Sequence, residues 1–331
     1  MREHRTVSKR RETILALLAL GAAGPLPAYA QPARRIAFLD DSDEASRAPQ
    51  WAVFRKRLEE LGYTASRGYP IEARWGKADL KRIHALAAEL VALKPAVIVA
   101  PSTLTALAAK RATSTIPIIY AGANDPIRTG LTTNFARPDG NVTGITIIQQ
   151  DLVGKWLELL REVAPRAKSL AFLSYVENLG AKQIFQDLQE KAKPLGMSVI
   201  TLDGTSPANV ERAFATMGRE RVDALIVTAS ATLLNQRLQI VQAVARSRIP
   251  ALYARREYVD AGGLMSYGSD YNVLYVRAAE YVHRILQGSK PADLPFERAA
   301  TFRLVLNFNT AAALGLKIPE TVRMRVDEVV Q

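Results

Sequence analysis

The chain has 331 residues, more than one typical domain, and suits two lobes of about 130 to 150 residues each. It contains no cysteine, which excludes disulfides, thiolate metal sites, cysteine nucleophiles and iron–sulfur clusters. Its net charge of +12 is scattered without interleaved aromatic residues, so we expect no nucleic-acid partner.

The first thirty residues have the features of a secretory leader. A basic segment at 9–11 precedes an apolar stretch at 14–23, and the sequence Ala-Tyr-Ala ending at Ala30 fits a signal-peptidase site. We therefore assign residues 1–30 as a signal peptide and expect a periplasmic protein. The arginine pair within the basic segment leaves twin-arginine export as an alternative route. No later apolar stretch approaches the roughly 20 residues of a membrane span, so no stable membrane insertion is expected.

Apolar strands and amphipathic helices alternate after the leader, which predicts an α/β fold with parallel sheets. The first series contains strands at 35–39, 70–75, 97–99, 116–120 and 141–146, with helices at 48–61, 80–93 and 103–111. The second contains strands at 169–174, 197–202, 222–228 and 250–253, with helices at 151–163, 180–193, 207–217 and 232–245. A strand at 263–268, a helix at 271–287, a strand at 302–307 and a helical turn capped by Asn309 follow.

One strand–helix–strand unit occurs twice, in residues 94–131 and 223–254. Its second strand reads STIPIIYA in the first copy and SRIPALYA in the second. Two similar lobes imply a cleft, and ligands of open parallel sheets bind at the carboxyl ends of the strands. We assign residues 31–145 and 258–290 to the N-terminal lobe, and residues 146–257 and 291–331 to the C-terminal lobe. A chain that passes repeatedly between lobes makes a hinge.

The sequence contains none of the common catalytic motifs. G-x-S-x-G, the P-loop, G-x-G-x-x-G and H-E-x-x-H are all missing. His84 and His283 lie in predicted amphipathic helices, where packing or surface roles are expected. The acidic turn at 40–44 lacks the spacing of an EF-hand and is expected to be a polar turn. We therefore expect no enzyme, no metal and no cofactor.

Four phrases in combination resemble the ABC transporter substrate-binding protein family that is related to tryptophan/tyrosine-type binding proteins. They are NVTGIT at 141–146, AGGLMSYGSD at 261–270, KPADLP at 290–295 and ALGLKIPETVRMRVDEVV at 313–330. The resemblance implies a type I periplasmic binding protein fold, with two Rossmann-like lobes, three crossovers and one ligand in the cleft. It also implies an ABC permease and its ATPase subunit as partners.

Carried onto this sequence, the family's cleft positions fall at the ends of the predicted strands. The candidate ligand-binding residues are Ser42, Asp43, Ser102, Thr103, Asn124, Asp125, Glu177, Asn178, Ser230, Glu257 and Tyr258. Ser102 and Thr103 open a helix whose free N–H groups suit a carboxylate. Asp125 suits an ammonium group, with the alternative that it caps its own turn before Pro126. Residues 175–178 depart from the Asn/Pro-rich sequence of many relatives, which leaves the ligand open.

We expect an extracytoplasmic receptor of an ABC import system that binds a small zwitterionic ligand, with aromatic amino acids as one candidate class. One alternative is a periplasmic sensor subunit of the same fold, and another is a secreted α/β enzyme. A repressor of the LacI type is disfavoured, because a leader occupies the place of a helix-turn-helix.

Overall fold

The structure is a computed structural model that describes residues 34–122, 124–299 and 301–330. The predicted signal peptide, residues 1–30, lies outside the described residues. None of the helices in the described part of the chain is long and apolar enough to span a bilayer.

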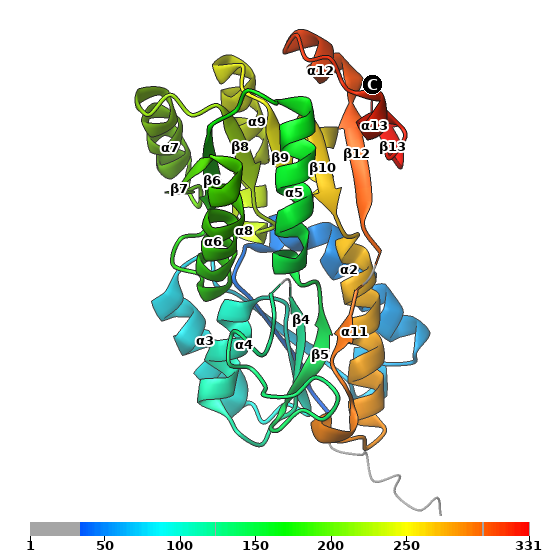
Figure 1. The fold of residues 1–331 in the computed structure, drawn as a ribbon. Coiled ribbons are helices and arrows are strands. Elements are labelled where there is room, and N and C mark those ends of the chain that lie inside the picture. The colour runs from blue at the N-terminus through cyan, green and yellow to red at the C-terminus, as the bar shows by residue number, and fades with distance from the viewer. Residues whose placement is uncertain (1–33, 123, 300, 331) are drawn as a thin grey trace, which may run out of the picture. The chain divides into compact units, whose positions relative to one another are not determined.

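The first lobe contains a six-stranded parallel sheet in the order β11-β5-β4-β3-β1-β2. Figure 1 labels β4 and β5 of this sheet, between the helices α4 and α11. Its strands are β1 (Ile36–Asp40), β2 (Ile71–Trp75), β3 (Val97–Ala100), β4 (Ile118–Gly122), β5 (Val142–Thr146) and β11 (Glu297–Arg298). Its helices are α2 (Glu44–Glu60), α3 (Leu80–Ala92), α4 (Thr103–Ala112) and α11 (Tyr271–Leu286), with 3₁₀ turns at Ala65–Arg67 and Pro291–Asp293. Side chains alternate along β1, so Phe38 packs with α2 and α11 while Leu39 packs with α3 and α4.

The second lobe contains a seven-stranded sheet in the order β13-β12-β10-β9-β8-β6-β7. Its strands are β6 (Ser169–Ser174), β7 (Ser198–Asp203), β8 (Ala224–Val227), β9 (Ala251–Tyr253), β10 (Met265–Gly268), β12 (Arg303–Asn307) and β13 (Glu328–Val330). Its helices are α5 (Gln149–Val163), α6 (Leu179–Ala192), α7 (Pro207–Arg219), α8 (Ala231–Leu234), α9 (Arg237–Ser247), α10 (Glu257–Asp260), α12 (Phe308–Ala313) and α13 (Glu320–Arg323), with a 3₁₀ turn at Lys193–Leu195. All neighbouring pairs are parallel except β10 and β12, which are antiparallel.

Helix caps explain where several helices begin. The side chains of Asp79, Ser102 and Ser206 accept hydrogen bonds from the backbone of the first turns of α3, α4 and α7. Helix α2 begins at Glu44 rather than at the expected residue 48, because Asp43 caps it and Pro49 is accommodated within the helix. The last predicted cap is also wrong, since Asn307 and not Asn309 caps α12.

Two of the predicted lobe boundaries disagree with the strand pairing. Residues 258–268 were expected in the N-terminal lobe, but β10 pairs with β9 and β12 in the second sheet. Residues 291–299 were expected in the C-terminal lobe, but the two-residue strand β11 pairs with β5 in the first sheet. The chain therefore passes between the sheets at about 147–148, at 269–270 and again between β11 and β12. These crossings bring the carboxyl ends of both sets of parallel strands to the same region.

Candidate functional site

A small cavity of about 50 Å³ lies between the two lobes at the carboxyl ends of their strands, and we call it the interlobe cavity. The first lobe lines it with Asp41, Arg47, Pro101, Ser102, Thr103 and Asn124. The second lobe lines it with Asn178, Ala229, Ser230 and Arg255, and Tyr271 lines it from the crossing into α11. Five of the predicted ligand-binding residues therefore meet here: Ser102, Thr103, Asn124, Asn178 and Ser230.

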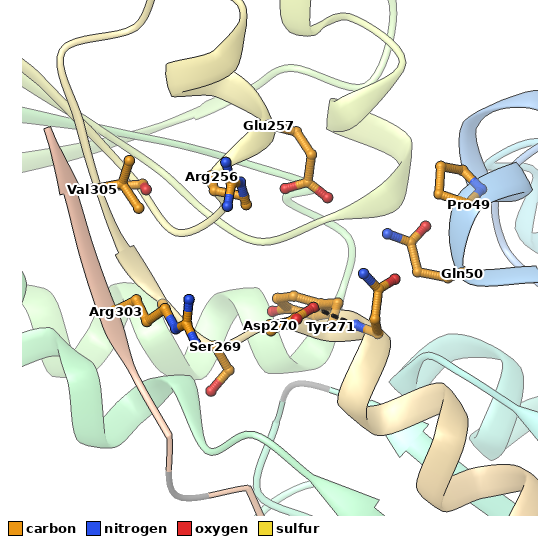
Figure 2. A pocket seen from close by; sticks show the side chains of 12 residues that line it. Pro49, Gln50, Arg256, Glu257, Ser269, Asp270, Tyr271, Arg303 and Val305 are labelled. Atoms are coloured by element: carbon orange, nitrogen blue, oxygen red, sulfur yellow. Dashed lines mark hydrogen bonds between the residues drawn. The ribbon is translucent and has the colours of Figure 1, made fainter. Parts of the chain in front are cut away.

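A second cavity of about 200 Å³ adjoins the crossing segments, and we call it the hinge cavity. Gln50, Glu257, Tyr271, Arg303 and Val305 are among its lining residues. Figure 2 shows the amide of Gln50 and the carboxylate of Glu257 pointing into the space beside the Tyr271 ring. The hinge cavity thus draws on both lobes and on the segments that join them.

Helix starts give the interlobe cavity part of its polarity. Ser102 and Asn178 are the N-caps of α4 and α6, two helices that begin at the cavity from opposite lobes. Ser230 caps the short helix α8 in the same way. Helix N-termini carry partial positive charge and unpaired N–H groups, so this part of the cavity favours an anionic group.

Asn124 contributes an acceptor to the cavity. Its Nδ2 donates to Thr103 Oγ1 at 2.9 Å, and the Tyr120 hydroxyl lies 3.2 Å from the same Thr103 oxygen. Because Thr103 is buried, its main role is to position the side chain of Asn124. Among the described residues, Asn124 Oδ1 is buried without a hydrogen-bond partner. A buried acceptor left unpaired is costly, so a donor group on a ligand would be favoured at this atom.

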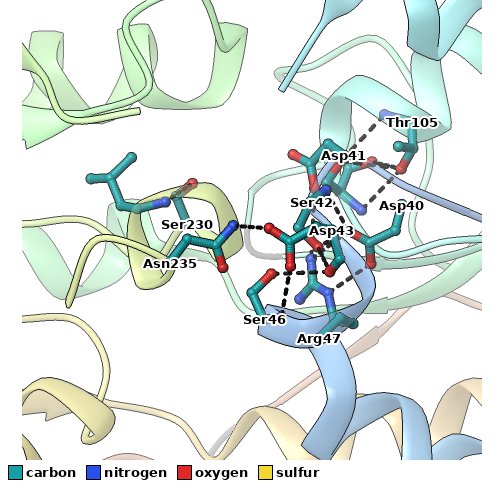
Figure 3. A network of polar contacts seen from close by, with 11 residues as sticks. Asp40, Asp41, Ser42, Asp43, Ser46, Arg47, Thr105, Ser230 and Asn235 are labelled. Carbon is teal, nitrogen blue, oxygen red and sulfur yellow. Dashed lines mark hydrogen bonds and ion pairs between the residues drawn. The ribbon is translucent and has the colours of Figure 1, made fainter. Parts of the chain in front are cut away.

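The turn after β1 forms a buried network of charges (Figure 3). Arg47 Nε lies 2.6 Å from Asp40 Oδ2, and Ser42 donates to Asp40 Oδ1 through both its backbone N–H and its hydroxyl. Asp41 is only loosely held, with its Oδ1 3.6 Å from Arg47 Nη2 and without a hydrogen-bond partner in the described chain. Burial, together with the neighbouring Asp40, raises the pKa of Asp41 to about 7. One arginine faces two carboxylates, so the network lacks one positive charge when Asp41 is ionised.

A second charge pair, between a buried arginine and a partly exposed glutamate, lies in the other lobe. The Arg255 side chain is 1 % exposed, and its guanidinium is bound by the Glu257 carboxylate on two nitrogens. Burial raises the pKa of Glu257, but Arg255 outweighs it and holds that pKa below its ordinary value. The Arg255 guanidinium also lies over the Tyr271 ring, 4.4 Å from its centroid. Arg255 and Tyr271 therefore form one rigid wall of the interlobe cavity.

The remaining predicted residues lie elsewhere. Ser42 and Asp43 line a wider groove of about 650 Å³, where Asp43 accepts a hydrogen bond from Asn235 of the opposite lobe. Asp125 caps its own turn, accepting from the backbone of Ile127 and Arg128, so the alternative expectation describes it better. Glu177 is exposed before α6. Glu257 reaches the hinge cavity, and Tyr258 is fully buried and stacked on Tyr253, so Tyr258 is withdrawn as a ligand contact.

Six lining residues of the cavity were missed from the sequence: the charged or polar Asp41, Arg47, Arg255 and Tyr271, and the apolar Pro101 and Ala229. Asp41, Arg255 and Tyr271 lie within two residues of a predicted strand end or at a predicted helix start, which was the available signal. Arg47 directly precedes the helix start predicted at residue 48, but nothing in the local sequence distinguishes a buried arginine there from an exposed one.

Several contacts join the lobes around the cavity. Arg128 forms a two-pronged ion pair with Asp187 of α6, and Gln183 donates to the Arg128 carbonyl at 2.7 Å. The Tyr175 hydroxyl donates to the Ala78 carbonyl at 2.9 Å. With the Asp43–Asn235 bond, these contacts join the two lobes directly.

Comparisons with known proteins agree with this architecture. The family model described as ABC transporter substrate binding protein matches residues 43–330. A tyrosine-binding protein of Clostridioides difficile (strain R20291) is 28 % identical over 265 residues, which cover 80 % of this chain and 76 % of that protein. The crystal structure of an ABC domain from Streptococcus pneumoniae in complex with L-Trp is 26 % identical, with a TM-score of 0.81 over 91 % of this chain and all of that one. A conserved domain protein from Vibrio cholerae O1 biovar El Tor gives 25 % identity and a TM-score of 0.83 over 90 % of this chain and all of that one. The predicted two-lobe fold is confirmed.

Proposed function

The chain belongs to the ABC transporter substrate-binding protein family, and from that premise we propose that it is an extracytoplasmic receptor for an α-amino-acid-like solute. The family binds solutes and is not a family of enzymes. The relatives named above include one described as a tyrosine-binding protein and one crystallised with L-Trp, which supports an amino acid as the ligand class here.

One observation supports an amino acid as the ligand. Buried acceptors without hydrogen-bond partners and helix N-termini line the same interlobe cavity. Asp41 Oδ1 and Asn124 Oδ1 are buried acceptors without a hydrogen-bond partner in the described chain, and both residues line the cavity. A ligand ammonium would satisfy both and would supply the positive charge that the Asp40–Asp41–Arg47 network lacks. The N-termini of α4 and α6 would receive the ligand carboxylate.

Closure follows from the same geometry. A ligand that touches residues of both lobes gains its full set of contacts only in the closed arrangement, so binding shifts the hinge equilibrium toward closure. The closed form would then be recognised by an ABC permease, with its ATPase subunit driving import. Export of the receptor through the leader at 1–30 would place it in the periplasm, by the general or the twin-arginine route.

The test is a thermal-shift screen of the processed protein against the proteinogenic amino acids, small carboxylates, sugars and nucleosides. An amino acid at 100 times its Kd should stabilise the protein by about 2.7 kcal/mol. Asp41→Asn should abolish that shift, because the ammonium loses its charged partner, while Asp125→Asn should keep it. The protein is refolded from denaturant beforehand, so that a retained ligand does not mask binding. If no amino acid shifts the refolded protein, or if only sugars or nucleosides do, the proposal is wrong.

A further inference from the structure

We propose that Tyr271 sets the size of the ligand, so that the native protein binds small α-amino acids and excludes aromatic ones. The inference rests on the proposed function and narrows it to one class of amino acid. It is drawn from three features of the structure: the volume of the interlobe cavity, the place of Tyr271 between two cavities, and the contacts that fix its ring.

The interlobe cavity has room for only a few heavy atoms. A cavity needs about 10–15 Å³ to hold one water molecule, and the interlobe cavity measures about 50 Å³. Pockets that hold drug-sized ligands are about 300–1,000 Å³. At about 10–15 Å³ for each water-sized group, the five heavy atoms of the ammonium, Cα and carboxylate of an amino acid already require this space, which leaves room only for a side chain as small as hydrogen or methyl.

Tyr271 separates this small polar cavity from a larger one. Among the described residues, it alone lines both the interlobe cavity and the hinge cavity of about 200 Å³. Pro49 and Val305 contribute apolar groups to the hinge cavity, and Gln50, which is 4 % exposed, contributes an Oε1 that has no hydrogen-bond partner in the described chain (Figure 2). The hinge cavity therefore offers an aromatic side chain both apolar contact and a polar acceptor, but Tyr271 stands between it and the ammonium site.

The Tyr271 ring is fixed in this position. Tyr271 is the first residue of α11, directly after the N-cap Asp270, so its backbone is set by the start of a 16-residue helix. The Arg255 guanidinium covers the ring at 4.4 Å, and Arg255 is in turn held by Glu257. The helix start fixes the backbone of Tyr271, and Arg255 covers one face of its ring. The ring therefore separates the two cavities and does not move aside for a larger ligand.

The experiment compares the native processed protein with Tyr271→Ala by titration calorimetry, using glycine, L-alanine, L-serine, L-tyrosine and L-tryptophan. The native protein should bind at least one of the three small amino acids ten-fold or more tightly than either aromatic one. Tyr271→Ala joins the two cavities and should gain at least ten-fold in affinity for tyrosine or tryptophan. Tyr271→Phe keeps the ring and should still exclude both, and Val273→Ala, an exposed change on the same helix, should leave all affinities as in the native protein.

The outcomes separate the two proposals. Native protein that binds tyrosine or tryptophan as tightly as the small amino acids overturns the role of Tyr271 but leaves the amino-acid receptor intact. A second outcome also overturns that role. It is a Tyr271→Ala protein that is folded, as shown by a native circular dichroism spectrum and cooperative unfolding, but has no higher affinity for tyrosine or tryptophan. Should Tyr271→Ala fail to fold, Tyr271→Leu replaces it under the same criteria. Native protein that binds none of the proteinogenic amino acids overturns the proposed function itself.

Discussion

Asn124 and Gly180 meet across the two lobes. A Cβ atom added at Gly180 would lie 2.2 Å from Cγ of Asn124 and closer than 2.5 Å to both of its terminal atoms. Asn124 follows β4 in the first lobe, and Gly180 lies in the first turn of α6 in the second. Because Asn124 also lines the interlobe cavity, the approach of the lobes and the shape of this cavity are linked at one contact.

Gly180→Ala should therefore weaken ligand binding by obstructing closure. Overpacking of this kind costs about 1–3 kcal/mol, and if the cost falls on the closed state alone, the Kd rises by about five- to 150-fold. Calorimetry measures the affinity, and small-angle scattering should show the variant more open at a ligand concentration that closes the native protein. Gly218→Ala is the matched control, because a Cβ there meets nothing within 4 Å in helix α7. Equal effects of the two substitutions would contradict the prediction.

The ion pair between Arg128 and Asp187 should contribute to closure in a salt-dependent way. Both guanidinium nitrogens contact the carboxylate, at 2.6 and 3.1 Å, but the Arg128 side chain is 39 % exposed. Such pairs are worth about 0.2–1 kcal/mol, so Asp187→Asn should raise the Kd up to about five-fold at low salt and have little effect at 1 M salt. Glu320→Gln, which removes an exposed pair within the second lobe, should change nothing at either salt concentration. A salt-independent loss in Asp187→Asn would point to a structural role instead.

Asp41 should make the unliganded protein less stable as the pH rises. Its pKa is about 7 in the folded protein against 3.8 for an ordinary aspartate, because burial and Asp40 disfavour the charged form. Between these values the folded state binds more protons than the unfolded state, so the free energy of unfolding falls as the pH rises through this window. Urea unfolding of native protein and Asp41→Asn at several pH values isolates the effect, because all other titratable groups are common to both proteins. A pH-independent difference between the two proteins would contradict the prediction.

Ligand binding should release the Asp41 proton. An ammonium group favours the ionised carboxylate, so the Kd should fall up to about ten-fold per pH unit as the pH rises toward 7 and level off above it. Calorimetry in buffers of different ionisation enthalpy counts the protons released at pH 6. Proton uptake, or a Kd that is flat between pH 5.5 and 7, would show that Asp41 does not meet the ammonium group.

Arg47→Met should destabilise the fold strongly. It removes the counter-charge of Asp40, whose carboxylate is fully buried, and such losses typically cost about 3–5 kcal/mol. Chemical denaturation measures the free energy of unfolding. Adding Asp40→Asn to Arg47→Met should recover part of the stability that Arg47→Met loses. Arg57→Met provides the comparison, since that arginine also pairs with carboxylates but is 32 % exposed and should cost under about 1 kcal/mol. Equal losses of unfolding free energy in Arg47→Met and Arg57→Met would show that burial does not determine the cost.

The two-lobe fold could be predicted because its signals are local. Continuous apolar strands, caps such as Ser102 and Ser206, and a repeated strand–helix–strand unit each depend on a few neighbouring residues. The edge strand β11 could not be predicted, because two residues carry no periodicity and their pairing with β5 is set by tertiary structure.

The site was predictable only in part for a similar reason. Polar residues at strand ends were found, and five of them line the interlobe cavity. A buried arginine such as Arg47 or Arg255 has the same local sequence features as one on the surface, and only the carboxylates that fold against it distinguish the two. Tyr258 and Tyr271 both follow strands, yet one is packed in the core and the other forms a cavity wall.

The interleaved order of the strands means that neither lobe is a continuous piece of the chain. The first sheet receives its edge strand from Glu297 and Arg298, and the second receives β12 and β13 from the residues after them. A product truncated before residue 297 would lack strands of both sheets at once, so premature termination or clipping there would damage both halves instead of releasing one intact. An isolated lobe would have to be made by rejoining separate segments, and both sheets have all of their described strands only when residues 297–330 are present.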